Sequence, residues 1–240
     1  QSIKDEYRNE VLFFFFFDFY EMFNEDALEI SRLLNLTLTH RAQHPMCGIP
    51  YHAADSYLTK LVSKGYKVAI CEQVEDPKLA KGIVKREVIR IVTPGTNLNM
   101  MSLEESKNNY LMCITYTEDK IGIAVVDAMT GDFYVTEVSD TKKLNDEIVK
   151  FSPSELICND NFLVSGYSID DLRERFGISV NKIDSWYFEE DSCQKLLCKH
   201  FKVNTLTALG VDDFAAGQIA AGAVLAYLYE TQKNSLSNIT

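Results

Sequence analysis

The sequence predicts an α/β protein made of two domains. Strand-like segments, either apolar throughout or alternating, are interspersed with segments whose apolar residues recur at helical spacing. At 240 residues, the chain is long enough for two domains that each bury a core. A polar and aperiodic stretch, residues 97–108, separates a mixed first half from a second half that opens with three strand-like segments.

The first half predicts a mixed α/β domain. The apolar run at residues 11–17 predicts a central strand in which Phe15, Phe16 and Phe17 are buried. Residues 25–34 have helical spacing and acidic residues in the first turn, where the helix dipole favours negative charge. The remaining predicted elements are, in order, a short strand at 36–39, a turn-rich connection at 45–50, a helix at 55–64 closed by Gly65, and strands at 66–71 and 84–93 joined by a loop.

The second half predicts a sheet that begins with three consecutive strands, at residues 110–115, 121–127 and 131–138, joined by short turns. The elements that follow are a helix at 141–150, a strand at 155–158, a helix at 169–176, a strand at 179–183 and an Ala- and Gly-rich helix at 213–232. An antiparallel meander followed by alternating helices and strands is the order of an RNase H-like fold. We therefore predict domains at 1–105 and 106–233, with 234–240 as a polar linker to a domain outside the chain.

Composition narrows the class of protein. With 46% hydrophobic and 25% charged residues, the chain resembles a soluble globular protein. Its net charge of −11, of which −3 falls in residues 1–105 and −8 in 106–240, has the wrong sign for a free-standing nucleic-acid binder. The most apolar stretch, residues 214–229, is too short for a membrane span, and we expect no membrane association. Because no signal peptide is evident and the chain opens at Gln1 without an initiator Met, we expect a fragment of a longer protein.

The six cysteines indicate a reducing compartment. They lie scattered without a C-x-x-C pair, and Cys71, Cys113 and Cys158 sit inside apolar runs, where a thiol behaves as a small hydrophobe. His40 and His44 are four residues apart but flank a turn-like stretch, so we expect no metal pair there. These observations predict a cytoplasmic protein without a bound metal.

Two patterns allow more than one interpretation. In the run LFFFFFDFYEMF (residues 12–23), an extended backbone would place Phe19 and Glu21 on the same side, whereas on a helix they would diverge by about 200°. Alternatively, Asp18 and Glu21 form a helix capping box, with Phe19 and Phe23 packed in the core. The basic residues within 78–90 either form a solvated face or face phosphates.

Four segments together resemble the N-terminal part of the MutS mismatch-recognition family, in matching order and approximate spacing. They are DFYEMF at 18–23, PMCGIPYH at 45–52, AICEQ at 69–73 followed by Asp76-Pro77, and RIVTPGT at 90–96. The second half, including DAMTGDF at 127–133, is similar to the connector domain of that family. The resemblance spans nearly the whole chain and implies a mismatch-recognition domain followed by an RNase H-like connector.

The resemblance implies a DNA-binding site. In that family a Phe-x-Glu motif reads the lesion, and here it maps onto Phe19 and Glu21. An inserted aromatic ring stacks on a base and kinks the duplex, and mismatched steps unstack more cheaply than paired ones. A carboxylate in a minor groove lined with acceptors is tolerated only where a displaced base supplies a proton. The other DNA-binding candidates are Arg41 (phosphate contact or solvated), Met46, and Tyr51 and His52 (lining the DNA or packing the turn).

The resemblance also implies partners and cofactors. The expected ligand is double-stranded DNA with mismatches or small loops, and the connector is associated with a MutL-type partner and inter-domain signalling. The longer parent is expected to be a homodimeric ATPase that uses ATP and Mg²⁺. The chain itself lacks G-x-x-x-x-G-K-[ST], and we expect it to be non-catalytic, without a cofactor of its own, monomeric and weakly DNA-binding.

The sequence departs from the family at two places. Members commonly carry Arg-x-Gly immediately before Asp-Phe-Tyr-Glu, whereas residues 15–17 are all Phe, and the loop at 38–45 is short. Loss of the Gly removes backbone freedom before the motif. A divergent paralogue that binds proteins or DNA structures without mismatch specificity therefore remains an alternative. A nuclease is another, with Asp127 as a first Mg²⁺ ligand, but neither Asp132 nor Glu155 is an evident partner.

Overall fold

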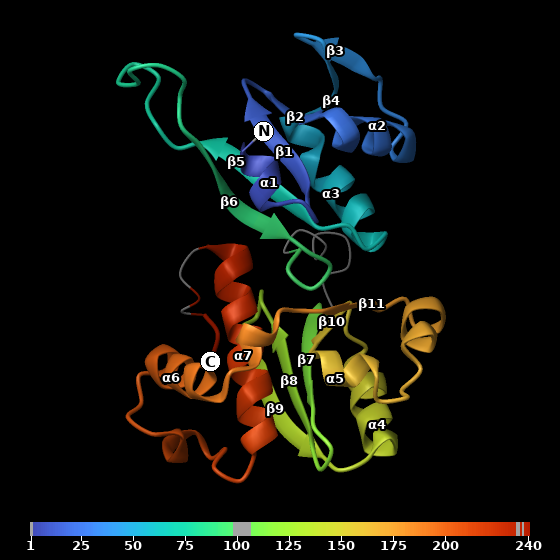
Figure 1. The fold of residues 1–240 in the computed structure, drawn as a ribbon, viewed down its shortest axis with the longest axis vertical. Coiled ribbons are helices and arrows are strands. Elements are labelled where there is room, and N and C mark those ends of the chain that lie inside the picture. The colour runs from blue at the N-terminus through green and yellow to red at the C-terminus, as the bar shows by residue number, and fades with distance from the viewer. Residues whose placement is uncertain (1, 98–106, 234–235, 237) are drawn as a thin grey trace. The chain divides into compact units, whose positions relative to one another are not determined.

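The computed structural model describes the chain except residues 1, 98–106, 234–235 and 237. The polar stretch predicted to hold the domain boundary lies largely outside the described residues, so that boundary stays a prediction. Two compact units are present, the first comprising residues 1–93 with Thr231–Lys233 and the second residues 94–230 with 234–240. Each unit contains one sheet with helices (Figure 1).

The first unit is built on a six-stranded mixed sheet. Its strands are β1 (Val11–Phe16), β2 (Phe19–Phe23), β3 (Thr39–Arg41), β4 (His44–Pro50), β5 (Val68–Gln73) and β6 (Arg86–Val92). Their order across the sheet is β3-β4-β2-β1-β5-β6. The pairing of β1 with β5 is parallel, and the other pairings are antiparallel.

Helices cover both faces of this sheet. They are α1 (Ser2–Glu6), α2 (Asn24–Leu33), the 3₁₀ turn η1 (Tyr51–Ala53) and α3 (Ala54–Ser63). On the α2 side the strands present Met22 and Cys47, and the Cys47 thiol contacts the Ala27 carbonyl of α2. On the other side, Ile3 of α1 packs against a cluster that includes Leu12. The two sides correspond to alternate residues of each strand.

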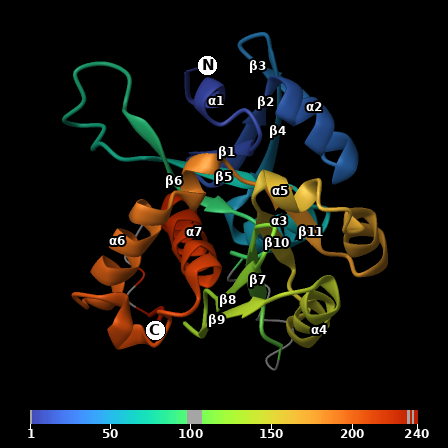
Figure 2. The same ribbon diagram turned by 60° about the horizontal axis from the view of Figure 1, so that its bottom comes forward.

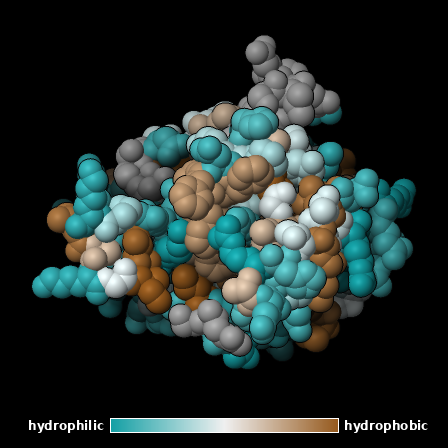
Figure 3. All heavy atoms as spheres, turned by 90° about the horizontal axis from the view of Figure 1, so that it is seen from above, coloured by the Kyte–Doolittle hydropathy of each residue, from teal (hydrophilic) through white to brown (hydrophobic). Residues whose placement is uncertain are grey.

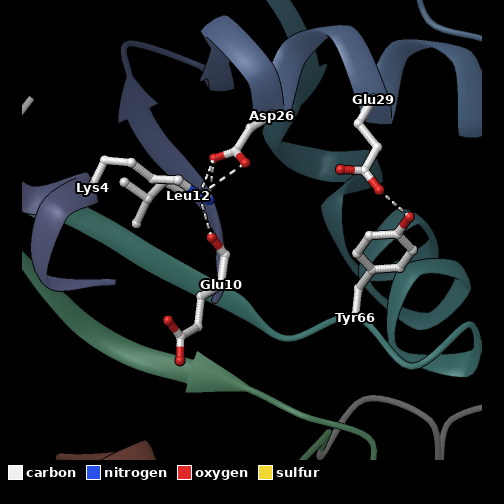
Figure 4. A network of polar contacts seen from close by, with 6 residues as sticks. All are labelled: Lys4, Glu10, Leu12, Asp26, Glu29 and Tyr66. Carbon is white, nitrogen blue, oxygen red and sulfur yellow. Dashed lines mark hydrogen bonds and ion pairs between the residues drawn. The ribbon is translucent and has the colours of Figure 1, made fainter. Parts of the chain in front are cut away.

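A small polar network ties α1 and α2 to the start of β1 (Figure 4). The Lys4 ammonium lies 2.9 Å from an Asp26 carboxylate oxygen and donates to the Glu10 carbonyl at 2.7 Å. The second Asp26 oxygen accepts the backbone N–H of Leu12 at 3.1 Å. Asp26 thus accepts a backbone N–H of β1 and pairs with the Lys4 ammonium, and the two interactions fix the position of the start of β1.

The second unit is built on a five-stranded sheet. Its strands are β7 (Tyr110–Tyr116), β8 (Ile121–Asp127), β9 (Phe133–Val138), β10 (Glu155–Cys158) and β11 (Ser179–Lys182), in the order β11-β10-β7-β8-β9. The first three form the predicted antiparallel meander, while β10 pairs parallel to β7 and β11 parallel to β10. This arrangement confirms the α/β class and the RNase H-like order.

Helices sandwich the second sheet. They are α4 (Thr141–Phe151), α5 (Asp160–Leu163), the π-helical turn η3 (Asp171–Arg175), the 3₁₀ turns η4 (Ser185–Phe188) and η5 (Leu206–Leu209), α6 (Glu190–Phe201) and α7 (Ala215–Gln232). One face packs on α6 and α7, and the other on α4 and α5 (Figure 2). The Gly-rich start of α7 lies directly on β8: a Cβ on Gly122 would come within 2.1 Å of the Ala216 carbonyl oxygen. Small residues on α7 and β8 thus allow the helix to pack closely on the sheet.

Two predictions about β3 and β4 were wrong. Residues 36–38 are not a strand, because pairing begins only at β3. The stretch 45–50 is strand β4 rather than a turn, since it pairs with β2 and β3 despite its two prolines, one of which ends the strand. In the tail predicted as a linker, the described residues Leu236 and Ile239 are buried in the core of the second unit, and the linker itself stays a prediction.

Among the described residues, none of the helices is long and apolar enough to span a membrane.

Candidate nucleic-acid interface

The β1–β2 hairpin turns more tightly than the sequence suggested. Phe16 pairs with Phe19, so Phe17 and Asp18 alone form the turn. Phe17 has φ 53° and is 89% exposed. The prediction that residues 11–17 form one buried strand is therefore wrong at Phe17, and Phe15 and Phe16 are only half-buried. A residue with positive φ in such a turn is usually Gly.

Strand β2 presents Phe19 and Glu21 on the same face. Both lie over Gly48 of β4, where an added Cβ would contact the Phe19 ring at 3.7 Å and the Glu21 Cγ at 3.9 Å. The extended interpretation is thus confirmed, and the capping-box alternative is wrong: α2 begins at Asn24, and the residue that caps it is Phe23. Phe19, the first residue of β2, is 47% exposed.

Tyr20, between them, points to the opposite face and anchors the hairpin. Its ring lies 5.9 Å from that of Phe13 and 5.3 Å from that of Phe15, and its hydroxyl donates to Glu72 at 3.2 Å. Burial, followed by the charge of Glu72, raises the pKa of Tyr20, so the hydroxyl stays protonated and can donate. The anchor leaves the backbone little freedom to move Phe19.

Glu21 is covered rather than open to solvent. Its carboxylate is paired with Arg41, whose Nη2 lies 2.9 Å from Oε1, while the buried Oε2 has no hydrogen-bond partner. Burial raises the pKa of Glu21, and Arg41 and Arg86 oppose that rise. The Phe19 ring and the Glu21 carboxylate lie on the same face, as expected, but they differ in exposure. The ring is exposed, whereas the carboxylate lies under an arginine.

The short β3–β4 hairpin explains this cover. Arg41 pairs with His44, and the two turn residues between them, Ala42 and Gln43, have φ values of 48° and 72°. Positive φ at both central residues is the geometry of a tight two-residue hairpin loop, although Ala and Gln are unusual there. Strand β4 lies between β3 and β2, so the Arg41 side chain reaches the Glu21 carboxylate across β4.

Arginines and aromatic rings share this face of the sheet. The rings of Phe14, Phe16 and Phe23 form a cluster with centroids 5.8 to 6.4 Å apart. The guanidinium groups of Arg41 and Arg86 lie 5.1 and 3.9 Å from the centroid of the Phe16 ring. Seen from above the view of Figure 1, the surface shows hydrophobic side chains among polar ones (Figure 3). This face combines stacking surface with positive charge, the two features that a nucleic-acid interface needs.

The remaining predicted residues are divided between the two faces. Met46 is half-buried opposite Phe23, on the face of Glu21. Tyr51 is 58% exposed but packs against Phe15, with centroids 5.4 Å apart, on the Tyr20 side. His52 is exposed on η1. The structure thus places Phe19, Glu21, Arg41 and Met46 on one face of the sheet, with Met46 at the far end of β2 from Phe19, and places Tyr51 on the other face.

Sequence reasoning missed Arg86 as a member of the site. It belonged to the basic run within 78–90, but only the pairing of β5 with β6 brings it to the aromatic face, where it also donates to the Phe15 carbonyl at 2.5 Å. Elsewhere in the run, Lys78 and Lys81 are exposed on the β5–β6 loop, and Lys85 pairs with Glu87 at 2.6 Å. The run is therefore not a single surface.

The candidate nuclease carboxylates have structural roles. Asp127 accepts the backbone N–H groups of Met129 and Thr130 at 2.9 and 3.1 Å, and Glu155 accepts the Tyr227 hydroxyl at 2.7 Å. Among the described residues, no cluster of three or more His, Cys, Asp or Glu could hold a metal ion. Nothing in this arrangement supports the nuclease alternative.

The fold and the site together define a two-domain α/β chain, in which a sheet carrying an arginine-flanked aromatic hairpin precedes an RNase H-like domain. Comparison with known proteins gives a family for that combination. Residues 1–100 match the family model of MutS domain I, and residues 109–240 that of MutS domain II. The chain therefore belongs to the MutS family.

Two bacterial MutS proteins are similar to this chain over nearly its whole length. The chain is 56% identical over 242 residues to the DNA mismatch repair protein MutS of Lachnoclostridium phytofermentans, covering 99% of this chain and 26% of the relative. It is 46% identical over 246 residues to that of Ruminiclostridium cellulolyticum, covering 99% of this chain and 28% of the relative. The chain thus spans about a quarter of the length of the curated relatives it matches.

Proposed function

We propose that this chain is the mismatch-recognition and connector region of a longer DNA mismatch repair protein, and that it binds duplex DNA at mismatches or small loops. The observation that carries the proposal is the geometry of β2. Phe19 is half-exposed at the start of the strand, on the same face as Glu21, and is held there by the buried anchor Tyr20. The relatives' name, DNA mismatch repair protein, agrees with this use.

The proposed role of Phe19 is to test how easily a base step opens. The ring enters the minor groove and stacks on a base, and the duplex kinks around it. A mismatched step opens at lower cost than a paired one, so the ring discriminates by deformability rather than by sequence. The rigid hairpin behind the ring matters because ordering a mobile ring on binding would cost conformational entropy, which would offset the stacking energy.

The proposed role of Arg41 is to exchange partners on binding. Its side chain is 45% exposed, so it can leave Glu21 for a DNA phosphate. Glu21 is then a buried carboxylate without its ion-pair partner, which favours any base that donates a proton to it. A matched duplex offers the minor groove mainly acceptors, and would leave that charge unpaired. The covered state thus raises the penalty for matched DNA.

We base the remaining proposals, on the longer protein and its partners, on the chain's membership of the MutS family. The longer protein acts as a homodimeric ATPase with ATP and Mg²⁺, is cytoplasmic, and receives the signal of DNA binding through the second domain, which also contacts a MutL-type partner. In the present chain, Met46 and His52 are secondary DNA contacts, while Tyr51 acts through the packing of Phe15. The alternative of a paralogue without mismatch specificity is favoured by one observation: residues 15–17 are all Phe, where family members commonly carry Arg-x-Gly.

Binding measurements distinguish these two functions. Fluorescence anisotropy with the longer protein that contains this chain would compare a duplex carrying one G·T pair with the matched duplex. We expect tighter binding to the mismatch in the wild type, loss of that preference in Phe19→Ala, and its retention in Phe19→Tyr. Equal affinity of the wild type for the two duplexes would support the alternative and contradict the proposal.

A further inference from the structure

Phe17 is the most exposed aromatic side chain of the hairpin, at 89% against 47% for Phe19. The neighbouring rings of Phe14, Phe15 and Phe16 all have aromatic or cationic partners. Within the described part of the chain, no other ring or cation is found against Phe17. The fold therefore does not use this ring.

The residue type at position 17 is unfavourable for the folded chain in two ways. Its φ of 53° lies in the left-handed region, which Gly, Asn and Asp adopt with less strain than Phe. Its ring also leaves apolar surface in water at a protruding turn. An aromatic residue that neither packs nor suits its backbone is explained by a ligand that the ring contacts.

The charges around the turn indicate what that ligand is. Arg41 and Arg86 lie against Phe16 just behind the tip, and can hold the DNA backbone there. At the tip itself the second turn residue is Asp18, an exposed carboxylate that repels phosphate. The contact of Phe17 is therefore with the uncharged face of an unpaired base, which stacks on an aromatic ring.

Building on the proposed function, we propose that Phe17 is a second stacking residue beside Phe19, and that it makes the hairpin selective for DNA with two or more unpaired nucleotides. A single mismatch offers one weakened step, which Phe19 occupies. A two-nucleotide insertion offers a second unpaired base that is already free of its partner, so stacking on Phe17 requires no further opening of the duplex. Selectivity for small loops over single mismatches follows.

The test uses the longer protein that contains this chain, and three labelled duplexes that differ only at the centre: matched, one G·T pair, and a two-nucleotide insertion. Phe17→Asn removes the ring but suits a positive φ, and Phe17→Trp keeps an aromatic ring. We expect Phe17→Asn to lose about fivefold or more in affinity for the insertion, the lower end of the value of one stacked base, and less than about twofold for the G·T pair. Phe17→Trp should bind as the wild type does.

Other outcomes separate this inference from the proposed function. If Phe17→Asn keeps wild-type affinity for the insertion while Phe19→Ala loses discrimination, Phe17 is not a stacking residue and the proposed function stands. An equal loss on all three duplexes would also overturn the inference, since it would show a contact indifferent to unpaired bases. If the wild type binds the three duplexes equally, both proposals fail. Thermal unfolding of Phe17→Asn at or above the wild-type temperature confirms that the fold is intact.

Discussion

Removal of Arg41 tests the cover over Glu21 most sharply. Arg41→Ala would leave the buried Glu21 carboxylate with neither its ion-pair partner at 2.9 Å nor a hydrogen bond on Oε2. Breaking a fully buried pair costs about 3–5 kcal/mol. Because the Arg41 side chain is 45% exposed and its charge is partly screened, we expect a loss of about 1–2 kcal/mol of stability in the first unit at neutral pH.

The loss of stability in Arg41→Ala should depend on pH, because the charge of Glu21 does. Burial already raises the pKa of Glu21 above its ordinary 4.5, and loss of Arg41 removes an interaction that opposes that rise. A carboxyl whose pKa is raised on folding contributes stability below its unfolded pKa, and that contribution is lost as the pH rises through the folded pKa. The penalty of Arg41→Ala should therefore be small near pH 4.5 and grow toward pH 8.

Hydrogen exchange of the β1 and β2 amides measures this effect in the first unit alone, and Trp186 fluorescence monitors the second unit as an internal control. In a Glu21→Gln background the same Arg41→Ala change should cost little at any pH, because no buried charge remains. A penalty that is absent at pH 8, or that is equally large near pH 4.5 and in the Gln background, would refute the pairing as the cause.

Two further substitutions test the backbone. Phe17→Gly should stabilise the first unit by about 0.5–1 kcal/mol in thermal unfolding, because relief of the left-handed strain exceeds the entropy that Gly adds to the unfolded chain; a lower melting temperature would show that the ring packs. Gly122→Ala should destabilise the second unit by about 1–3 kcal/mol, read by Trp186 fluorescence, because the new Cβ would meet the Ala216 carbonyl of α7; wild-type stability would mean that α7 shifts freely.

Much of the fold was predictable because local patterns agreed with the tertiary structure. Strands β8 and β10 and helices α2 and α4 fall within about two residues of their predicted ranges, since apolar periodicity and end signals coincide there. Helix α6 was missed because charged and Cys residues weaken its pattern, although Glu189 caps it by accepting two backbone N–H groups. Strand β4 was missed because its Pro and Gly residues favour a turn locally, and only pairing with two neighbours overrides that preference.

The site was predictable only in part. The two-residue spacing of Phe19 and Glu21 identified their common face, because side-chain direction in a strand depends on the backbone alone. The exposure of Phe17 was hidden by the apolar run, in which nothing distinguishes the last ring of a strand from the first residue of a turn. The cover over Glu21 depends on a hairpin some twenty residues later in the sequence, and no local pattern encodes it.

The central claim is that one face of β2 carries both the residue that opens a mismatch and the residue that rejects matched DNA. The most direct measurement is the affinity of Phe19→Ala and of Glu21→Gln, in the longer protein that contains this chain, for mismatched and matched duplexes. We expect opposite failures: Phe19→Ala loses affinity for the mismatch, by about 1–3 kcal/mol for one stacked base, and Glu21→Gln gains affinity for the matched duplex. If the two variants lose affinity for both duplexes to the same extent, the face does not discriminate and the account is contradicted.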